Sequence, residues 1–123
     1  MHEMVVSKYP CICCGFIVMP DYPGSYALCP ICGWEDDEAQ ARDPYYAGGA
    51  NRNSLYAAQQ MFLRAGVADG GLLPGSIRDP SEADERDTTW RPIDPAVDRF
   101  DPLIQRDKSR RELLYWKEPA DAP

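Results

Sequence analysis

The sequence predicts an α+β fold, in which a small antiparallel sheet near the N-terminus packs against a C-terminal helical extension. Two Cys-x-x-Cys-Gly units lie close together, short β-prone segments flank them, and apolar residues recur at helical spacing only after residue 54. A chain of 123 residues is long enough for one domain of ordinary size. We therefore expect residues 1–50 and residues 51–123 to form one cooperative unit.

The predicted sheet surrounds the two cysteine units. Residues 4–6 are expected to form a strand that leads into the first unit, and residues 16–19 a second strand after it. Pro23 and Gly24 predict a turn, after which residues 26–28 return toward the second unit. So few strands bury too little apolar surface to be stable alone, and this half needs a further constraint.

The cysteines supply that constraint. All five lie within the first 32 residues, and Cys11 with Cys14 and Cys29 with Cys32 form two pairs, each followed by glycine. Glycine tolerates the left-handed backbone that ends such a turn. Four thiolates at about 2.3 Å complete a tetrahedral shell around Zn²⁺ and leave no open position. The pattern therefore predicts a structural zinc site of the zinc-ribbon type, with metal binding coupled to folding.

Three other uses of these four cysteines are less favoured. An odd number of cysteines without a secretion signal disfavours a disulfide framework. A redox Cys-x-x-Cys pair normally lies in a longer βαβ unit, which the sequence lacks. Iron is compatible with the same four ligands, although zinc is preferred.

The fifth thiol, Cys13, lies inside the first pair and points away from the metal if Cys11 and Cys14 both bind it. We expect a packed residue, and a substitute ligand or a reactive thiol are the alternatives. The only histidine, His2, lies close to the chain end. No Ser-His-Asp or Cys-His catalytic pairing is therefore expected.

An acidic run, Glu35-Asp36-Asp37-Glu38, follows Trp34. Consecutive carboxylates point in different directions on regular backbone, which disfavours a second metal site. The run is expected to be a solvated acidic face or the first turn of a helix. Its functional alternative is contact with a basic protein partner.

Helices are expected in the second half. Asn53 or Ser54 caps the first, Gly66 ends it, and an apolar stripe packs it on the sheet. That stripe consists of Leu55, Ala58, Met61, Phe62 and Ala65. Residues 67–102 are expected to be an irregular wrap anchored by Trp90, Ile93, Val97 and Phe100. Residues 103–116 are expected to be helical, with Ile104, Leu113, Leu114 and Trp116 in contact and Arg106, Lys108, Arg110 and Arg111 exposed.

With both cysteine units located, the chain resembles the bacterial cysteine-rich CPCC family of small zinc-ribbon-like proteins, over residues 9–66. The matching segments are Tyr9-Pro10-Cys11-Ile12-Cys13-Cys14-Gly15-Phe16, Gly24-Ser25-Tyr26, Cys29-Pro30-Ile31-Cys32-Gly33-Trp34-Glu35-Asp36-Asp37, Gly48-Gly49-Ala50-Asn51 and Ser54-Leu55. Ile12 departs from the proline that the family usually has there. The resemblance implies metal binding without an established enzymatic activity, and several relatives look like accessory or partner proteins.

Charge and composition limit the function. A net charge of −7 disfavours a nucleic-acid ligand. With no apolar run of about 20 residues and no signal peptide, a cytoplasmic protein without membrane contact is expected. We predict a non-catalytic zinc-binding interaction module whose acidic surface binds a basic protein, in its narrowest form an immunity protein that neutralises a nuclease-type bacterial toxin. The alternatives are a thiol, redox or metal-dependent enzyme that uses Cys13 or the acidic run, and a nucleic-acid-binding zinc ribbon.

Overall fold

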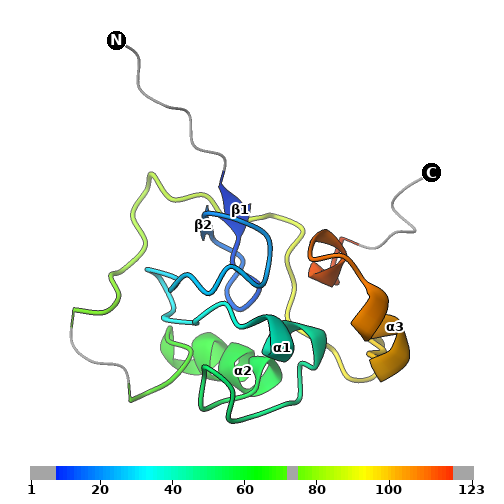
Figure 1. Ribbon diagram of the computed structural model, residues 1–123. Helices are drawn as coiled ribbons and strands as arrows, with labels where there is room; N and C mark the ends of the chain where they lie inside the picture. The colour runs from blue at the N-terminus through cyan, green and yellow to red at the C-terminus, as the bar shows by residue number, and fades with distance from the viewer. Residues whose placement is uncertain (1–7, 72–74, 118–123) are drawn as a thin grey trace.

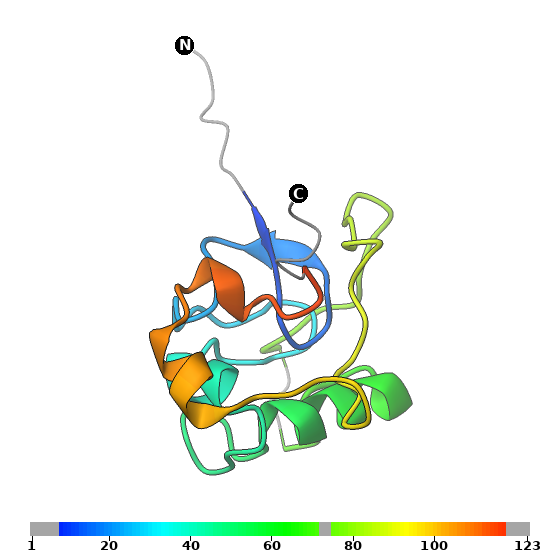
Figure 2. The same cartoon turned by 90° about the vertical axis from the view of Figure 1, so that its right-hand side faces the viewer.

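The computed structural model describes residues 8–71 and 75–117 and has a small α+β architecture (Figure 1). In chain order its elements are β1 (Tyr9–Pro10), β2 (Ile17–Met19), α1 (Glu38–Arg42), α2 (Leu55–Ala65), α3 (Pro102–Asp107) and a 3₁₀ turn, η1 (Arg111–Leu113). The predicted strand at residues 4–6 and His2 lie outside the described residues. The α+β class and the antiparallel sheet are confirmed, with α2 lying below the sheet in both views (Figures 1 and 2).

The first cysteine unit is the turn of a hairpin. β1 pairs antiparallel with β2, with Tyr9 opposite Met19 and an irregular register next to it. A distant segment extends this hairpin, because Ile17 N–H donates to the Glu85 carbonyl at 2.8 Å and Asp87 N–H donates to the Gly15 carbonyl at 2.8 Å. Residues 85–87 thus lie along β2 as a third strand would.

The second cysteine unit is also the turn of a hairpin, but its arms are short. Leu28 lies opposite Glu35 in an isolated antiparallel bridge. Residues 26–28 return to the second unit as expected, but they are not a continuous strand because Tyr26 adopts a left-handed backbone with φ of 61°. Tyr26 N–H donates to the Asp36 carbonyl and Asp36 N–H to the Ala27 carbonyl, so two residues of one arm oppose one of the other. This arrangement is a β-bulge.

The helix α2 begins and ends as the sequence predicts. The Ser54 hydroxyl accepts a hydrogen bond from Ala57 N–H at 3.1 Å, and Gly66 closes the helix with φ of 78°. Its apolar stripe is only partly buried, since Leu55 and Ala58 are in the core, Met61 and Phe62 are half-buried and Ala65 is exposed. The side chain that the periodicity missed is Gln59, which is wholly buried beside Ala58.

The single helix predicted over residues 103–116 is wrong, because the chain forms two separate pieces. The Ser109 hydroxyl accepts from Glu112 N–H, and the Glu112 carboxylate accepts from Ser109 N–H at 2.7 Å. This capping box starts η1 as a new helical turn. The preceding helix α3 ends against α1, where the Arg42 guanidinium donates to the carbonyls of Gln105 and Lys108 at 2.8 and 2.7 Å.

The predicted anchors of the C-terminal half are borne out in part. Ile93 and the residues Leu113, Leu114 and Trp116 are buried, and Trp90 and Phe100 pack against the core. Val97 and Ile104 are wrong as anchors, because both are more than 60 % exposed. Val97 lies in a turn closed by Asp98 N–H and the Asp94 carbonyl, and α3 instead turns Gln105 inward.

Arg110, expected to be exposed, is half-buried and donates to the carbonyls of Tyr22 and Pro23.

Within residues 8–71 and 75–117, the structure has no helix with the length and apolar character needed to cross a bilayer.

Candidate metal centre

The two cysteine turns share one backbone design. In the first turn, Cys11 N–H donates to the Phe16 carbonyl at 2.8 Å, and Gly15 N–H donates back to the Cys11 carbonyl at 2.7 Å. The same two bonds recur in the second turn among Cys29, Gly33 and Trp34, at 2.9 and 3.0 Å. The closing glycines have φ of 82° and 87°, the left-handed conformation for which the sequence supplies glycine.

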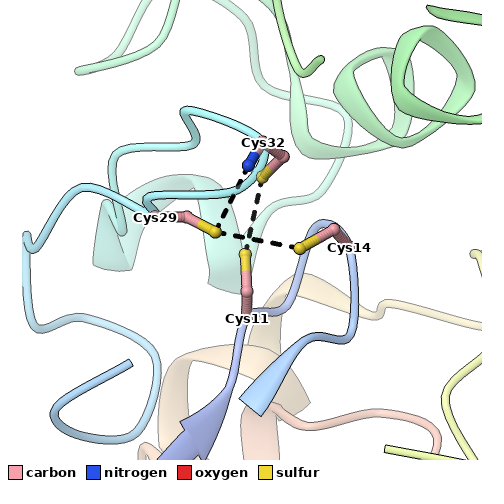
Figure 3. A group of neighbouring side chains, drawn as sticks. All are labelled: Cys11, Cys14, Cys29 and Cys32. Atoms are coloured by element: carbon pink, nitrogen blue, oxygen red, sulfur yellow. Dashed lines mark hydrogen bonds between the residues drawn. The ribbon is translucent and has the colours of Figure 1, made fainter. Parts of the chain in front are cut away.

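The four paired cysteines converge on one point, two from each turn (Figure 3). The Sγ atoms of Cys11 and Cys32 lie 3.7 Å apart, those of Cys14 and Cys29 lie 3.8 Å apart, and all four lie within 4.8 Å of one another. Sulfurs at about 2.3 Å from a tetrahedral metal are about 3.8 Å from each other. A disulfide needs about 2.05 Å, and all five cysteines are free thiols. The spacing therefore fits a four-coordinate metal and excludes a disulfide framework in this structure.

Burial disfavours negative charge on these four thiols unless a cation lies among them. All four side chains are 0 % exposed. Desolvation is the main cause that raises the pKa of the Cys11 and Cys32 thiols well above the ordinary value, whereas hydrogen bonds from Cys11 and the other thiols lower the pKa of Cys29. Ile31 N–H and Cys32 N–H also donate to the Cys29 sulfur, at 3.4 and 3.5 Å. Four thiolates can coexist here only around a positive ion, which is how metal binding and thiol ionisation are coupled.

The first turn is enclosed by side chains from the second half of the chain. The Ile12 carbonyl accepts from the Gln59 amide at 3.0 Å and from the Trp90 indole at 3.2 Å. The Cys14 carbonyl accepts from Arg86 Nε at 2.9 Å. The guanidinium carbon of Arg86 lies 5.2, 5.5 and 4.8 Å from the ring centroids of Phe16, Phe62 and Trp90. Such a stack holds a cation over the aromatic faces and fixes its segment against the turn.

The second turn is supported by a buried amide network. The Asn51 side chain accepts from Glu35 N–H at 2.9 Å and donates to the Glu35 carbonyl at 2.6 Å, as a neighbouring strand would. The amide of Gln40, which is wholly buried, bonds both the side chain and the backbone of the half-buried Asn51. Gly49 passes so close that a Cβ there would lie 2.6 Å from an Asp37 oxygen. The Gly-Gly-Ala-Asn segment is thus a clamp on the second hairpin.

This network corrects the prediction of a solvated acidic face. Asp36 is 2 % exposed and accepts from the hydroxyl of Ser25, while Asp37 is 5 % exposed, caps α1 and accepts from Ala50 N–H. Burial raises the pKa of Asp36. Asp37 is internal because residues 49–50 fold back over it, and Asp36 is internal against Ser25, so neither presents a surface to a partner. Glu35 and Glu38 remain half-exposed, and Glu38 pairs with Arg42.

Cys13 is not one of the four converging thiols, although it lies near Cys32, and it is 0 % exposed. Its position fits the packed residue that we expected. A reactive thiol needs solvent access, which this side chain lacks.

Several residues that shape the centre carry no signal in the cysteine spacing. They are Gln40, Asn51, Gln59, Arg86 and Trp90. Asn51 belongs to the segments that carry the family resemblance, and Trp90 was expected as an anchor of residues 67–102, although not at the cysteine turn. The other three, Gln40, Gln59 and Arg86, act through contacts between separate segments of the chain, which periodicity does not report.

The residues present fit a tetrahedral metal ion held by Cys11, Cys14, Cys29 and Cys32. The four sulfurs fill the coordination shell, and their burial leaves no path for a substrate, so such an ion would organise structure.

Comparison with known proteins agrees with this site. The family model described as Cysteine-rich CPCC matches residues 9–84, which is more than half of the chain and includes all five cysteines. No curated protein matches the chain. On the strength of that match, the chain belongs to the cysteine-rich CPCC family.

Proposed function

We propose that this chain is a non-catalytic protein-interaction module of the zinc-ribbon type, organised by one structural zinc ion, and that it binds a basic protein. The observation that carries the proposal is the complete burial of the four converging thiols. A catalytic zinc site keeps one position for water or substrate, and this set of ligands offers none. What the ion supplies is rigidity in the two hairpins.

Zinc is the proposed ion because four thiolates in a closed tetrahedral shell are the commonest structural zinc site. Iron would occupy the same ligands and would give visible absorbance, which zinc does not. Elemental analysis of protein purified without chelator should therefore find one zinc per chain and a colourless solution. A metal-free protein that keeps its fold in strong chelator would refute the proposal.

The basic partner follows from the charge of the chain. The net charge is −7, and exposed carboxylates without an ion pair inside the described part include Asp79, Glu82 and Glu85. A field of this sign accelerates association with a positively charged protein. The narrowest form of this proposal is that the chain is an immunity protein against a nuclease-type toxin, since enzymes that cleave nucleic acids carry basic clefts.

The partner proposal is tested with the product of the neighbouring gene, co-expressed with this chain and purified at low and at high salt. We expect a complex that weakens as salt rises, and that weakens at least tenfold when Glu82 and Glu85 are both changed to lysine. Asp107→Lys is the matched control, because Asp107 is 77 % exposed and lies beyond the cysteine turns in sequence. A complex that is indifferent to salt and to the double reversal would rule out an acidic binding surface.

A further inference from the structure

The second hairpin has an unpaired edge at Leu28. Leu28 and Glu35 form a pair flanked by the Cys29–Trp34 and Asp36–Ala27 backbone hydrogen bonds. In an antiparallel pair of this kind, the N–H and C=O of both residues point away from the partner arm. The backbone groups of Leu28 make no hydrogen bond anywhere in residues 8–71 and 75–117.

At the corresponding positions elsewhere in the two hairpins, the outward backbone groups are either hydrogen-bonded or include no N–H donor. The outward groups of Glu35 are taken by the Asn51 amide. In the first hairpin, Ile17 N–H is taken by the Glu85 carbonyl. Opposite Ile17 stands Pro10, which has no N–H and so cannot donate to an added strand. Leu28 occupies the place before Cys29 that Pro10 occupies before Cys11, yet keeps both its donor and its acceptor.

The side chains beside this edge are apolar and exposed. Leu28 is 48 % exposed and Tyr26 is 52 % exposed. Tyr26 holds a left-handed backbone that a non-glycine residue adopts at a cost, and its hydroxyl donates to the buried Asp37 at 3.3 Å. The bulge thereby fixes an aromatic ring next to the open edge.

An unpaired carboxylate beside this edge favours a ligand with positive charge. Glu35 lies directly opposite Leu28, so both side chains project from the same face of the hairpin. The Glu35 carboxylate has neither an ion pair nor a hydrogen bond in the part of the chain that the structure describes. If a further strand were added beside Leu28, a lysine or arginine side chain on it would be long enough to reach past Leu28 to Glu35.

We propose that the Leu28 edge receives an extended segment of the basic partner, which adds to the second hairpin as a β-strand. The N–H and C=O of Leu28 bond the backbone of that segment, Tyr26 and Leu28 contact its side chains, and Glu35 faces its basic residue. This inference rests on the proposed function and adds a binding edge on the second hairpin to the acidic residues named there. A bound metal would matter for this binding edge, because the second cysteine turn sets the direction of the hairpin arm that carries Leu28.

The test uses a displayed library of random linear peptides, selected against the zinc-loaded protein. Selected peptides should be enriched in lysine and arginine and should slow hydrogen exchange of the Leu28 amide. Leu28→Pro removes the edge donor, whose N–H is not used within the protein, and should weaken binding by about tenfold or more. Methylating alternate backbone nitrogens of the peptide should have the same effect.

Leu63→Lys is the control for Leu28→Lys, since Leu63 is a similarly exposed leucine (52 %) on α2. It should leave binding unchanged. If Leu28→Pro loses its fold by circular dichroism, Leu28→Lys takes its place, because it keeps the backbone and adds a repelling charge for a basic peptide.

Binders that ignore both Leu28 variants, or a selection that yields none, would overturn the edge assignment. Protection of Leu28 that rises with protein concentration in the absence of peptide would show that a second copy of the chain occupies the edge, and would overturn it as well. A natural basic partner that still binds Leu28→Pro would refute this inference while leaving the proposed function intact.

Discussion

The side-chain amide of Gln59 lies 3.0 Å from the carbonyl oxygen of Ile12 and joins α2 to the first cysteine turn. The same amide nitrogen donates to the Tyr115 hydroxyl, and the amide oxygen accepts from Ile93 N–H at 2.8 Å. One wholly buried glutamine therefore ties three distant segments to the metal centre. Buried polar hubs of this kind are costly to break, because each lost partner leaves a desolvated group behind.

Gln59→Leu should lower the free energy of unfolding by about 3 kcal/mol, since it leaves the Ile93 N–H unpaired in the core. Urea unfolding followed by circular dichroism measures the change. The neighbouring Gln60 is half-buried and makes no hydrogen bond through its side chain within the described residues, so Gln60→Leu should cost much less. Equal losses in the two variants would show that the hub contributes nothing specific.

Gly49→Ala should destabilise the second hairpin by about 1–3 kcal/mol, because the new methyl group would lie 2.6 Å from Asp37 Oδ2 and 2.9 Å from Gln40. The expected signature in NMR spectra is a displaced Glu35 amide, since the clamp on that amide shifts. Gly70→Ala serves as the control, as a Cβ there meets nothing within 4 Å. A neutral Gly49→Ala would contradict the clamp.

Cys14→Ala should abolish stoichiometric metal binding, whereas Cys13→Ala should retain one metal ion per chain. The two thiols are adjacent and equally buried, but only Cys14 lies in the converging set. Elemental analysis and chelator competition distinguish them. Metal loss from both variants in equal measure would mean that Cys13 is a ligand.

Removing the metal with a chelator should unfold both halves in one transition. The reason is that Gln59, Arg86 and Trp90 all bond carbonyls of the first turn, so its collapse withdraws partners from the C-terminal half. NMR signals from α2 should vanish together with those of the cysteine turns. Survival of α2 after chelation would separate residues 1–50 from residues 51–123 as independent units.

Asp98→Asn should destabilise the protein by about 1–2 kcal/mol at pH 7 and by less near pH 4. The Arg91 guanidinium donates two hydrogen bonds of 2.7 Å to Asp98 and lowers the pKa of that carboxyl. A lowered pKa stabilises the fold above the unfolded value of about 3.9, and the contribution is lost as pH falls through the folded value. The gap between wild type and variant should therefore narrow in acid.

The free energies for that comparison come from urea unfolding with excess zinc present. Asp107→Asn, at a residue 77 % exposed, is the control and should show no such pH-dependent gap. A gap between wild type and Asp98→Asn that stays constant from pH 7 to pH 4 would contradict the assigned ion pair.

Local chemistry in the sequence predicted the features that depend on neighbouring residues. The Cys-x-x-Cys-Gly spacing located both turns, and Ser54 and Gly66 marked the ends of α2, because each of these signals acts over a few residues. Ser109 and Glu112 formed an equally local capping box that the helical prediction overlooked.

The features that were missed depend on contacts between distant segments. Asp36 and Asp37 have the composition of a solvated face, but Ala50 returns to bond Asp37 and the Ser25 hydroxyl bonds Asp36. Gln59 lies on the buried side of α2 among apolar neighbours, where a polar residue gives no periodic signal. Hydrogen bonds between distant segments determine the burial of these side chains, and the spacing of residues within one segment does not predict such bonds.

The enclosure of the four sulfurs also sets the timescale on which the protein can exchange its metal. An ion sealed behind the Gln59, Arg86 and Trp90 bonds leaves only when those segments open, so its departure is limited by local unfolding and not by coordination chemistry. An ion captured as the chain first folds would then be retained, and we expect the metal content of a preparation to reflect the metals available during synthesis.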